Sequence, residues 1–204
     1  MLKELGYREL LSEVASKKPA PGGGSVSAAV GAFGCALLSM VCNLTIGKKK
    51  YRDVESQVND LLTRAEELRS RFVELLDEDT AAFNRLFAFF KLKEMTEEQK
   101  REMADAERAC IEVPQSTMKT ALSGLEVAAE LAPIGNKNAI SDVGVAVACL
   151  ETAFRGAEFN VRINLGNMDA DTREPYERWL GDTGERFQGL VEQAMETVKV
   201  ELGL

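Results

Sequence analysis

The residues best suited to chemistry begin with a glycine-rich segment, P-A-P-G-G-G-S, over residues 19–25. A long uncharged run follows it, which predicts that the glycine N–H groups stand at a helix N-terminus, where backbone amides attract carboxylates and phosphates. The segment matches neither a G-x-x-x-x-G-K-[ST] loop nor a G-x-G-x-x-G turn. A tight turn that lets two helices approach closely explains the glycines equally well on local grounds.

Two carboxylates are candidates for proton transfer. Asp142 lies in the first turn of a predicted helix whose next residues, 143–150, carry no charge. Such a helix start is expected to enter the core or a cleft, where a carboxylate needs a partner or a function, although an acid there can also simply cap the helix. Asp79 ends the run Asp77-Glu78-Asp79, of which only one side chain can face a given site, and most such runs are solvated faces.

Polar side chains also stand at the ends of two otherwise apolar helices. Asn43 interrupts an apolar run shortly before the three lysines 48–50, which can grip an anionic tail or complement the negative end of the helix dipole. Asn160, Arg162 and Asn164 close a later helix. Those side chains can read a polar ring or cap the helix end, and their spacing does not decide between the two.

Composition excludes several classes of function. The net charge of -8 argues against nucleic-acid binding, because an acidic surface repels phosphate backbones. The chain has no histidine, and its four cysteines form no C-x-x-C pair, so we expect no metal site and read the cysteines as small buried hydrophobes. No signal peptide is evident at residues 1–7, and we expect a cytoplasmic protein.

The elements that must position these residues are helices. Apolar residues recur at spacings of three and four and predict helices over residues 2–16, 25–46, 51–91, 97–131, 139–165 and 174–202. Leu10 and Leu11 should face inward on the first of them, and Pro114 should kink the fourth without ending it. The sequence thus predicts one all-α domain over 1–204, an up-and-down bundle of five to six long antiparallel helices. At about 60 Å, the third helix should outrun the bundle and pack against a second subunit.

One membrane alternative follows from the run Val26–Ile46, which has no charged residue and is long enough to span a bilayer. The run is rich in Ala, Gly and Ser and stands alone in an amphipathic chain. A helix that is apolar all round is either core or membrane, and the rest of the chain supplies a core. We therefore expect a helix buried in protein.

Four segments taken together resemble one family. They are A-P-G-G-G-S-V-S-A-A-V-G-A-F-G (20–34), N-L-T-I-G-K-K-K-Y (43–51), G-N-K-N-A-I-S-D-V-G-V-A (135–146) and N-V-R-I-N-L (160–165). In this order they resemble the formimidoyltetrahydrofolate cyclodeaminase and methenyltetrahydrofolate cyclohydrolase family. The departures are small: Lys17-Lys18 precedes the glycine motif, and Lys137 stands in the asparagine turn in place of a proline.

The resemblance implies a helical homodimer that acts on one-carbon tetrahydrofolates, with the folate as substrate and no further cofactor. A carboxylate suits either family reaction, because it can stabilise the amidinium cation and move a proton. We assign that role to Asp142 first and to Asp79 second. The groups expected to orient the pterin or attract the glutamate tail are Gly22, Gly23, Gly24, Ser25, Asn43, Lys48, Lys49, Lys50, Asn138, Arg162 and Asn164.

The expected reaction is hydrolysis of 5,10-methenyltetrahydrofolate to 10-formyltetrahydrofolate, because the chain has no room for the transferase that normally supplies a formimino group. The alternative is formimidoyltetrahydrofolate cyclodeaminase, which closes the same one-carbon bridge and releases ammonia. A non-catalytic folate-binding module is a second alternative.

Overall fold

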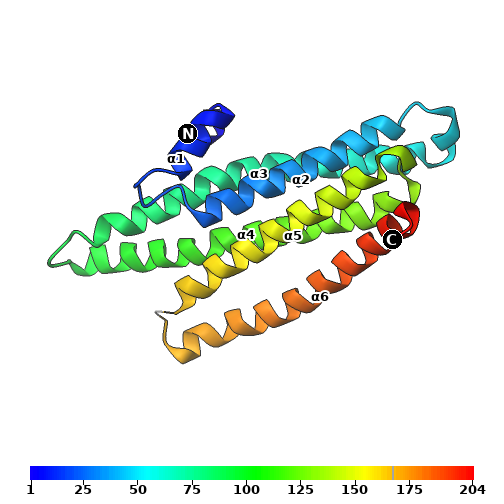
Figure 1. The fold of residues 1–204 in the computed structure, drawn as a ribbon. Helices are drawn as coiled ribbons and strands as arrows, with labels where there is room; N and C mark the ends of the chain where they lie inside the picture. The colour runs from blue at the N-terminus through cyan, green and yellow to red at the C-terminus, as the bar shows by residue number, and fades with distance from the viewer. Residues whose placement is uncertain (167) are drawn as a thin grey trace.

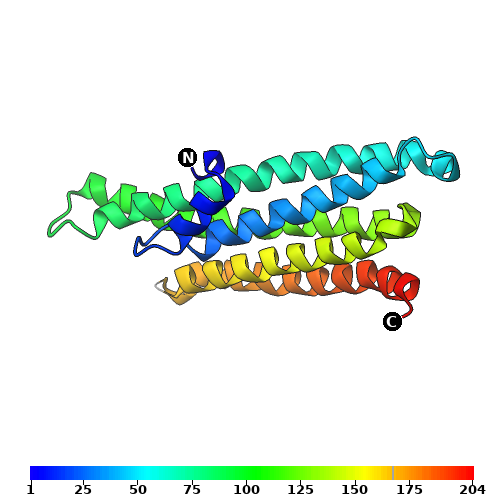
Figure 2. The same cartoon turned by 45° about the horizontal axis from the view of Figure 1, so that its top comes forward.

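Four long antiparallel helices form the body of the protein, and a fifth covers one side of it. The computed structural model describes residues 1–166 and 168–204 (Figure 1). The four are α2 (Gly23–Thr45), α3 (Glu55–Phe89), α4 (Glu97–Ile134) and α5 (Ile140–Leu165). Helix α6 (Ala170–Leu202) packs on α4 and α5, and the short α1 (Tyr7–Val14) lies on the outside near α2 and α3 (Figure 2). Among the described residues no strand occurs, so the predicted all-α bundle is confirmed.

Helix α2 lies between α3 and α5 and approaches both closely because its small residues permit it. A Cβ added at Gly31 would meet the Phe72 ring of α3 at 2.4 Å, and one added at Gly34 would meet Leu150 of α5 at 3.0 Å. Ser27 lies against Gly156 of α5 in the same way. These contacts fix α2 antiparallel to α5, with the start of α2 beside the end of α5.

Helix α4 begins and continues as the sequence predicts. Thr96 accepts a hydrogen bond from the Gln99 N–H, and the Gln99 side chain accepts one from the Thr96 N–H, which together form a capping box. The helix continues past Pro114 and Pro133 to Ile134, so Pro114 is not a boundary. Helix α6 begins earlier than predicted, because Asp169 caps the N–H of Thr172.

The first helix was predicted too long and too buried. Helix α1 has no buried residue, and Leu11 is 50% exposed rather than inward. The reason is that α1 lies across the α2–α3 surface outside the bundle, where only one edge of so short a helix can be covered.

The four cysteines were predicted to be buried, and three of them are. Cys149 is only partly buried.

The third helix runs past the start of α2 and the end of α5, but α4 runs beside it (Figure 1). Residues 49–54 form a separate 3-10 turn (η2), which leaves α3 with 35 residues and α4, its antiparallel neighbour, with 38. At 1.5 Å per residue these helices span about 52 and 57 Å, so α4 accompanies α3 along its whole length. The projecting end is thus shared by two helices of one chain, and a subunit interface on α3 stays a prediction.

Helix α2 is the one described helix that is long and apolar enough to cross a membrane by length and composition. The core helix of a soluble protein can have the same length and composition. Here α2 has twelve buried residues and packs on both α3 and α5. This packing agrees with the expectation of a helix buried in protein.

Candidate functional site

The N-terminus of α2 receives its cap from a different helix. Gly22 is the N-cap residue, and it has no side chain that could accept hydrogen bonds from the first backbone N–H groups of the helix. Asp79 of α3 takes that place: the Ser25 hydroxyl donates a 2.8 Å hydrogen bond to Asp79 Oδ2, and the Ser25 N–H also stabilises this carboxylate. Thr80 Oγ1 lies 3.0 Å from the same Ser25 hydroxyl. A carboxylate is thus held at the positive end of the α2 dipole.

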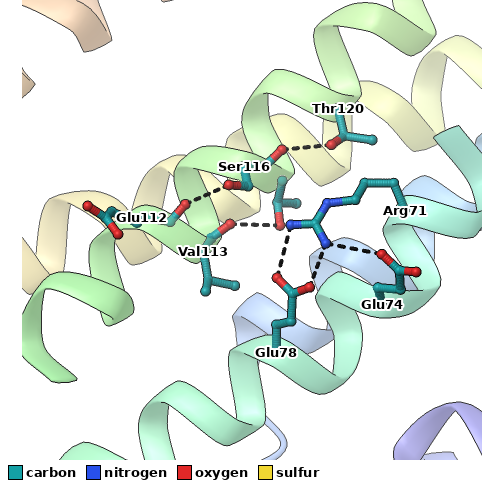
Figure 3. Close-up of polar contacts among 8 residues, drawn as sticks. Arg71, Glu74, Glu78, Glu112, Val113, Ser116 and Thr120 are labelled. Carbon is teal, nitrogen blue, oxygen red and sulfur yellow. Dashed lines mark hydrogen bonds and ion pairs between the residues drawn. The ribbon is translucent and has the colours of Figure 1, made fainter. Parts of the chain in front are cut away.

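The three members of the acidic run 77–79 have three different partners. Asp77 Oδ1 accepts a 2.6 Å hydrogen bond from the Leu2 N–H, which ties the N-terminal segment to α3. Glu78 pairs with Arg71 of its own helix, as Figure 3 shows. Asp79 alone points at the start of α2. The run is therefore not a uniform solvated face, and only one of its acids serves this site.

Burial raises the pKa of Asp79, and the two hydrogen bonds from Ser25 partly oppose that shift. Cys110 of α4 stands close enough to feel the carboxylate. Burial, followed by the charges of Asp79 and Glu107, raises the pKa of the Cys110 thiol to about 11. The thiol is therefore neutral at pH 7, which leaves Asp79 as the acid-base candidate of this pair.

The glycines of the segment stand in three different environments. A Cβ at Gly24 would lie 2.0 Å from Asp79 Oδ1, so only glycine admits the carboxylate at this distance. A Cβ at Gly23 would meet Asn160 Nδ2 of α5 at 3.5 Å, and one at Gly22 would meet nothing within 4 Å. Close approach therefore explains Gly24, while Gly22 and Gly23 stand at the helix start, where the first backbone N–H groups have no partner within the helix.

The end of α5 completes this side of the site. Asn160 lies beside Gly23, and its amide donates a 2.8 Å hydrogen bond to the Gly156 carbonyl. Asn164, one turn further, donates to the Cys110 carbonyl at 2.7 Å. Arg162 points away and forms an ion pair with Glu158 on the exposed surface. Arg162 is thus separated from the site, and Asn160, which the sequence left undecided, belongs to it.

The remaining predicted residues lie at the opposite end of α2. Asn43 and Lys48–Lys50 are exposed, and Lys48 and Lys49 line an open hollow with Arg52. Asn138 is exposed as well. The buried amide of that turn is Asn136, whose side chain donates to the Leu44 carbonyl at 2.9 Å and whose N–H donates to Thr45 Oγ1. The position of Asn136 directly after a helix end could have indicated a buried capping residue, but the sequence alone does not distinguish Asn136 from Asn138.

Asp142 is not the buried carboxylate that its uncharged sequence context suggested. It is partly exposed in the first turn of α5, and no described residue forms a hydrogen bond or ion pair with it. The uncharged residues behind it do enter the core, but through the face that carries Val143, Ala146 and Val147. Asp142 stands 18 residues before Asn160 on the same helix, about 27 Å from the start of α2. One chain therefore does not bring Asp79 and Asp142 together.

No metal centre is evident at either end. Among the residues that the structure describes, no group of three or more His, Cys, Asp and Glu side chains is placed to hold an ion.

Known proteins resemble the chain over its whole length. A profile of the formiminotransferase-cyclodeaminase family matches residues 6–178. A methenyltetrahydrofolate cyclohydrolase from Methylorubrum extorquens is 37% identical and covers 93% of both chains. A rat formimidoyltransferase-cyclodeaminase is 32% identical over 99% of this chain, which spans 37% of that protein.

The fold agrees with these sequence matches. The crystal structure of a formiminotetrahydrofolate cyclodeaminase from Thermotoga maritima superimposes with a TM-score of 0.89 at 30% identity and covers 98% of each chain. Sequence and structure lead to one conclusion: this chain belongs to the formiminotransferase-cyclodeaminase family.

Proposed function

We propose that the protein hydrolyses 5,10-methenyltetrahydrofolate to 10-formyltetrahydrofolate at the N-terminus of α2. The observation that carries the proposal is Asp79, a half-buried carboxylate that Ser25 holds at the N-terminus of α2 and that Gly24 admits. The cyclohydrolase relative supports the choice of reaction, since its similarity extends over 93% of its own length.

The chemistry asks for an ionised acid beside a cation. The methenyl bridge carries a positive charge delocalised over two nitrogens, and a carboxylate at van der Waals distance stabilises it. Asp79 takes one proton from water as the water oxygen bonds to the bridge carbon, and this proton passes to N5 as the bond between N5 and that carbon breaks. The remaining hydroxyl proton leaves to solvent as the formyl C=O forms, so the cation and water give a neutral product and one proton. The Asn160 side chain and the amides at Gly22 and Gly23 are placed to orient the pterin.

Turnover with methenyltetrahydrofolate tests the proposal. The expected result is loss of the near-ultraviolet absorbance of the bridge at a rate proportional to enzyme concentration. Equilibrium binding of the same compound without turnover would instead support the non-catalytic folate-binding module.

Cyclodeaminase activity is the second candidate, because the rat and Thermotoga relatives bear that name and the same groups suit it. In that reaction a protonated acid delivers a proton to the departing amine. Release of ammonia from 5-formimidoyltetrahydrofolate, at a kcat/KM above that for methenyltetrahydrofolate hydrolysis, would favour this reading.

We further propose a homodimer, with α2 rather than α3 at its interface. The outward ridge of α2 is formed by six apolar residues spaced four and three apart: Val26, Val30, Phe33, Leu37, Met40 and Leu44. That spacing is the a/d seam of a coiled coil. Phe33 is 59% exposed and α2 carries no charge, whereas the described residues of α3 include no exposed large apolar side chain before its C-cap residue Phe90, which is 61% exposed. An exposed apolar seam of this kind is covered when a second helix packs against it.

An antiparallel pairing fits the charges better than a parallel one. A parallel pair would bring the two sets of Lys48–Lys50 together, while an antiparallel pair sets these lysines beside the acidic end that carries Asp77 and Asp79. The antiparallel pair also brings Lys48–Lys50 of one subunit close to Asp79 of the other, whereas within one chain these two groups lie about 30 Å apart. The lysines of one subunit would then attract the glutamate tail of a folate bound at Asp79 of the other.

Mixed dimers test this arrangement. Asp79→Asn and the triple variant Lys48→Ala, Lys49→Ala, Lys50→Ala are each assayed alone and after mixing and subunit exchange, with polyglutamylated substrate well below KM. A site shared between subunits predicts recovery to about one quarter of wild-type activity, because half of the random dimers carry one intact site. Activity equal to the mean of the two parents would place both groups in one subunit's site.

A further inference from the structure

Pro114 creates a defect in α4 close to the site. Proline has no N–H, so the carbonyl of Cys110, four residues earlier, loses the hydrogen bond that a helix normally gives it. Both Cys110 and Pro114 are buried, and Cys110 is only 8% exposed. A buried carbonyl without a donor costs about 1–3 kcal/mol, so some other group must reach it.

Asn164 supplies the missing donor from another helix. Its Nδ2 lies 2.7 Å from the Cys110 oxygen, in the last turn of α5. Other carbonyls around the proline receive extra donors from their own helix: the Ser116 hydroxyl donates to Glu112, and Thr120 donates to Ser116 (Figure 3). The Cys110 carbonyl is different because its side-chain donor comes from α5.

This bond lies next to the groups that surround Asp79. Cys110 senses the Asp79 charge, and Cys110 and Asn164 together line a small cavity of about 100 Å³ with Leu86 and Phe90 of the α3 end. One turn before Asn164 on α5, Asn160 touches Gly23 at the start of α2. A shift of the α5 end would therefore move Asn160 relative to Asp79.

We propose that Asn164 is a positioning residue whose amide replaces the hydrogen bond that Pro114 removes and so fixes the end of α5 against α4. Its role in the reaction rests on the proposed function, whereas the coupling between Asn164 and Pro114 does not. The idea replaces the sequence-based expectation that Asn164 binds substrate directly, because its amide joins two helices, whereas the amide of Asn160 bonds only within α5.

A double-mutant cycle tests the coupling. Asn164→Ala in the wild-type background leaves the Cys110 carbonyl unpaired and should lower the folding equilibrium constant about tenfold or more. In the Pro114→Ala background, the backbone N–H that alanine brings to this position closes the helical bond, and the same change should cost about threefold or less. Denaturant unfolding monitored by circular dichroism gives both values. Equal losses in the two backgrounds would overturn the proposal.

Asn160→Ala is the matched control, since Asn160 bonds to a carbonyl of its own helix and its effect should be independent of Pro114→Ala. Asn164→Asp gives a second readout. Its ionised side chain offers no donor, so its stability deficit should shrink as acid protonates it and restores an O–H donor. A deficit independent of pH would contradict the assigned bond.

Kinetics separate positioning from direct binding. Measured at a temperature where every variant is folded, Asn164→Ala should lower kcat about tenfold or more with little change in KM, and adding Pro114→Ala should restore part of kcat. A rise in KM that Pro114→Ala does not relieve would return Asn164 to substrate binding. If wild type turns over no folate, the proposed function fails while the stability cycle still decides the coupling.

Discussion

The three glycines at the start of α2 form a graded steric series, and this series predicts a graded loss of activity. In Gly24→Ala the new Cβ would lie 2.0 Å from Asp79 Oδ1 and 2.6 Å from its Cγ, so the carboxylate must retreat by about 1 Å to reach a tolerable contact. A displacement of that size at a reacting group costs about 10²-fold in rate. Overpacking destabilises by about 1–3 kcal/mol, partly offset by the better helix propensity of alanine.

Gly22→Ala is the matched control, because it keeps the backbone N–H assigned to the pterin, no protein atom lies within 4 Å of its added Cβ, and its φ of -127° suits any residue. Its stability cost should be about 1 kcal/mol or less, the size of a weak N-cap change, with kcat near wild type. Gly23→Ala, at 3.5 Å from Asn160, should fall between the two. The assay is kcat with methenyltetrahydrofolate, beside urea unfolding. Equal kcat for Gly22→Ala and Gly24→Ala would refute the placement of the reacting group at Asp79.

Burial raises the pKa of Asp79, so kcat/KM should rise with pH through an ionisation above the ordinary carboxyl range, a limb that Asp79→Asn removes. The same shift favours the protonated folded state, so the stability of wild type relative to Asp79→Asn should be greatest at low pH and decline as pH rises through the folded pKa, measured by urea unfolding. Replacing Lys48, Lys49 and Lys50 by Ala should raise KM more for polyglutamylated than for monoglutamylated folate; equal effects would leave the lysines as helix-end charges. Phe33→Glu places a charge in the outward α2 seam and should shift the protein from dimer to monomer in light scattering, while a dimer at all dilutions would move the interface elsewhere.

The bundle was predictable because its signals are local. Apolar spacing marked each long helix, and the Thr96–Gln99 capping box fixed the start of α4. Pro114 did not end α4, because its missing N–H leaves one carbonyl to be satisfied and Asn164 satisfies it. Asn164 lies 50 residues after Pro114 in the sequence, so no local sequence pattern predicts that it donates this hydrogen bond.

The site was predictable as a set of residue types but not as an arrangement. The glycine segment and Asp79 were both named, yet their contact depends on how α2 packs against α3. Asp142 was ranked first because the residues behind it are uncharged, and helical geometry then turned those residues inward and left Asp142 partly exposed. A run of neutral residues indicates that a helix is buried, but it does not indicate whether a residue next to the run lies on the buried face or on the exposed face of that helix.

Turnover of methenyltetrahydrofolate by Asp79→Asn shows whether the carboxylate at the start of α2 transfers the proton. Asparagine keeps the size of the side chain and can still accept the Ser25 hydrogen bond, so the variant should fold, as circular dichroism would verify. Loss of the ionised acid should lower kcat by about two to four orders of magnitude, while Asp142→Asn, assayed in parallel, should lower it less. A folded Asp79→Asn enzyme with wild-type kcat would contradict the account and leave Asp79 as a cap for α2.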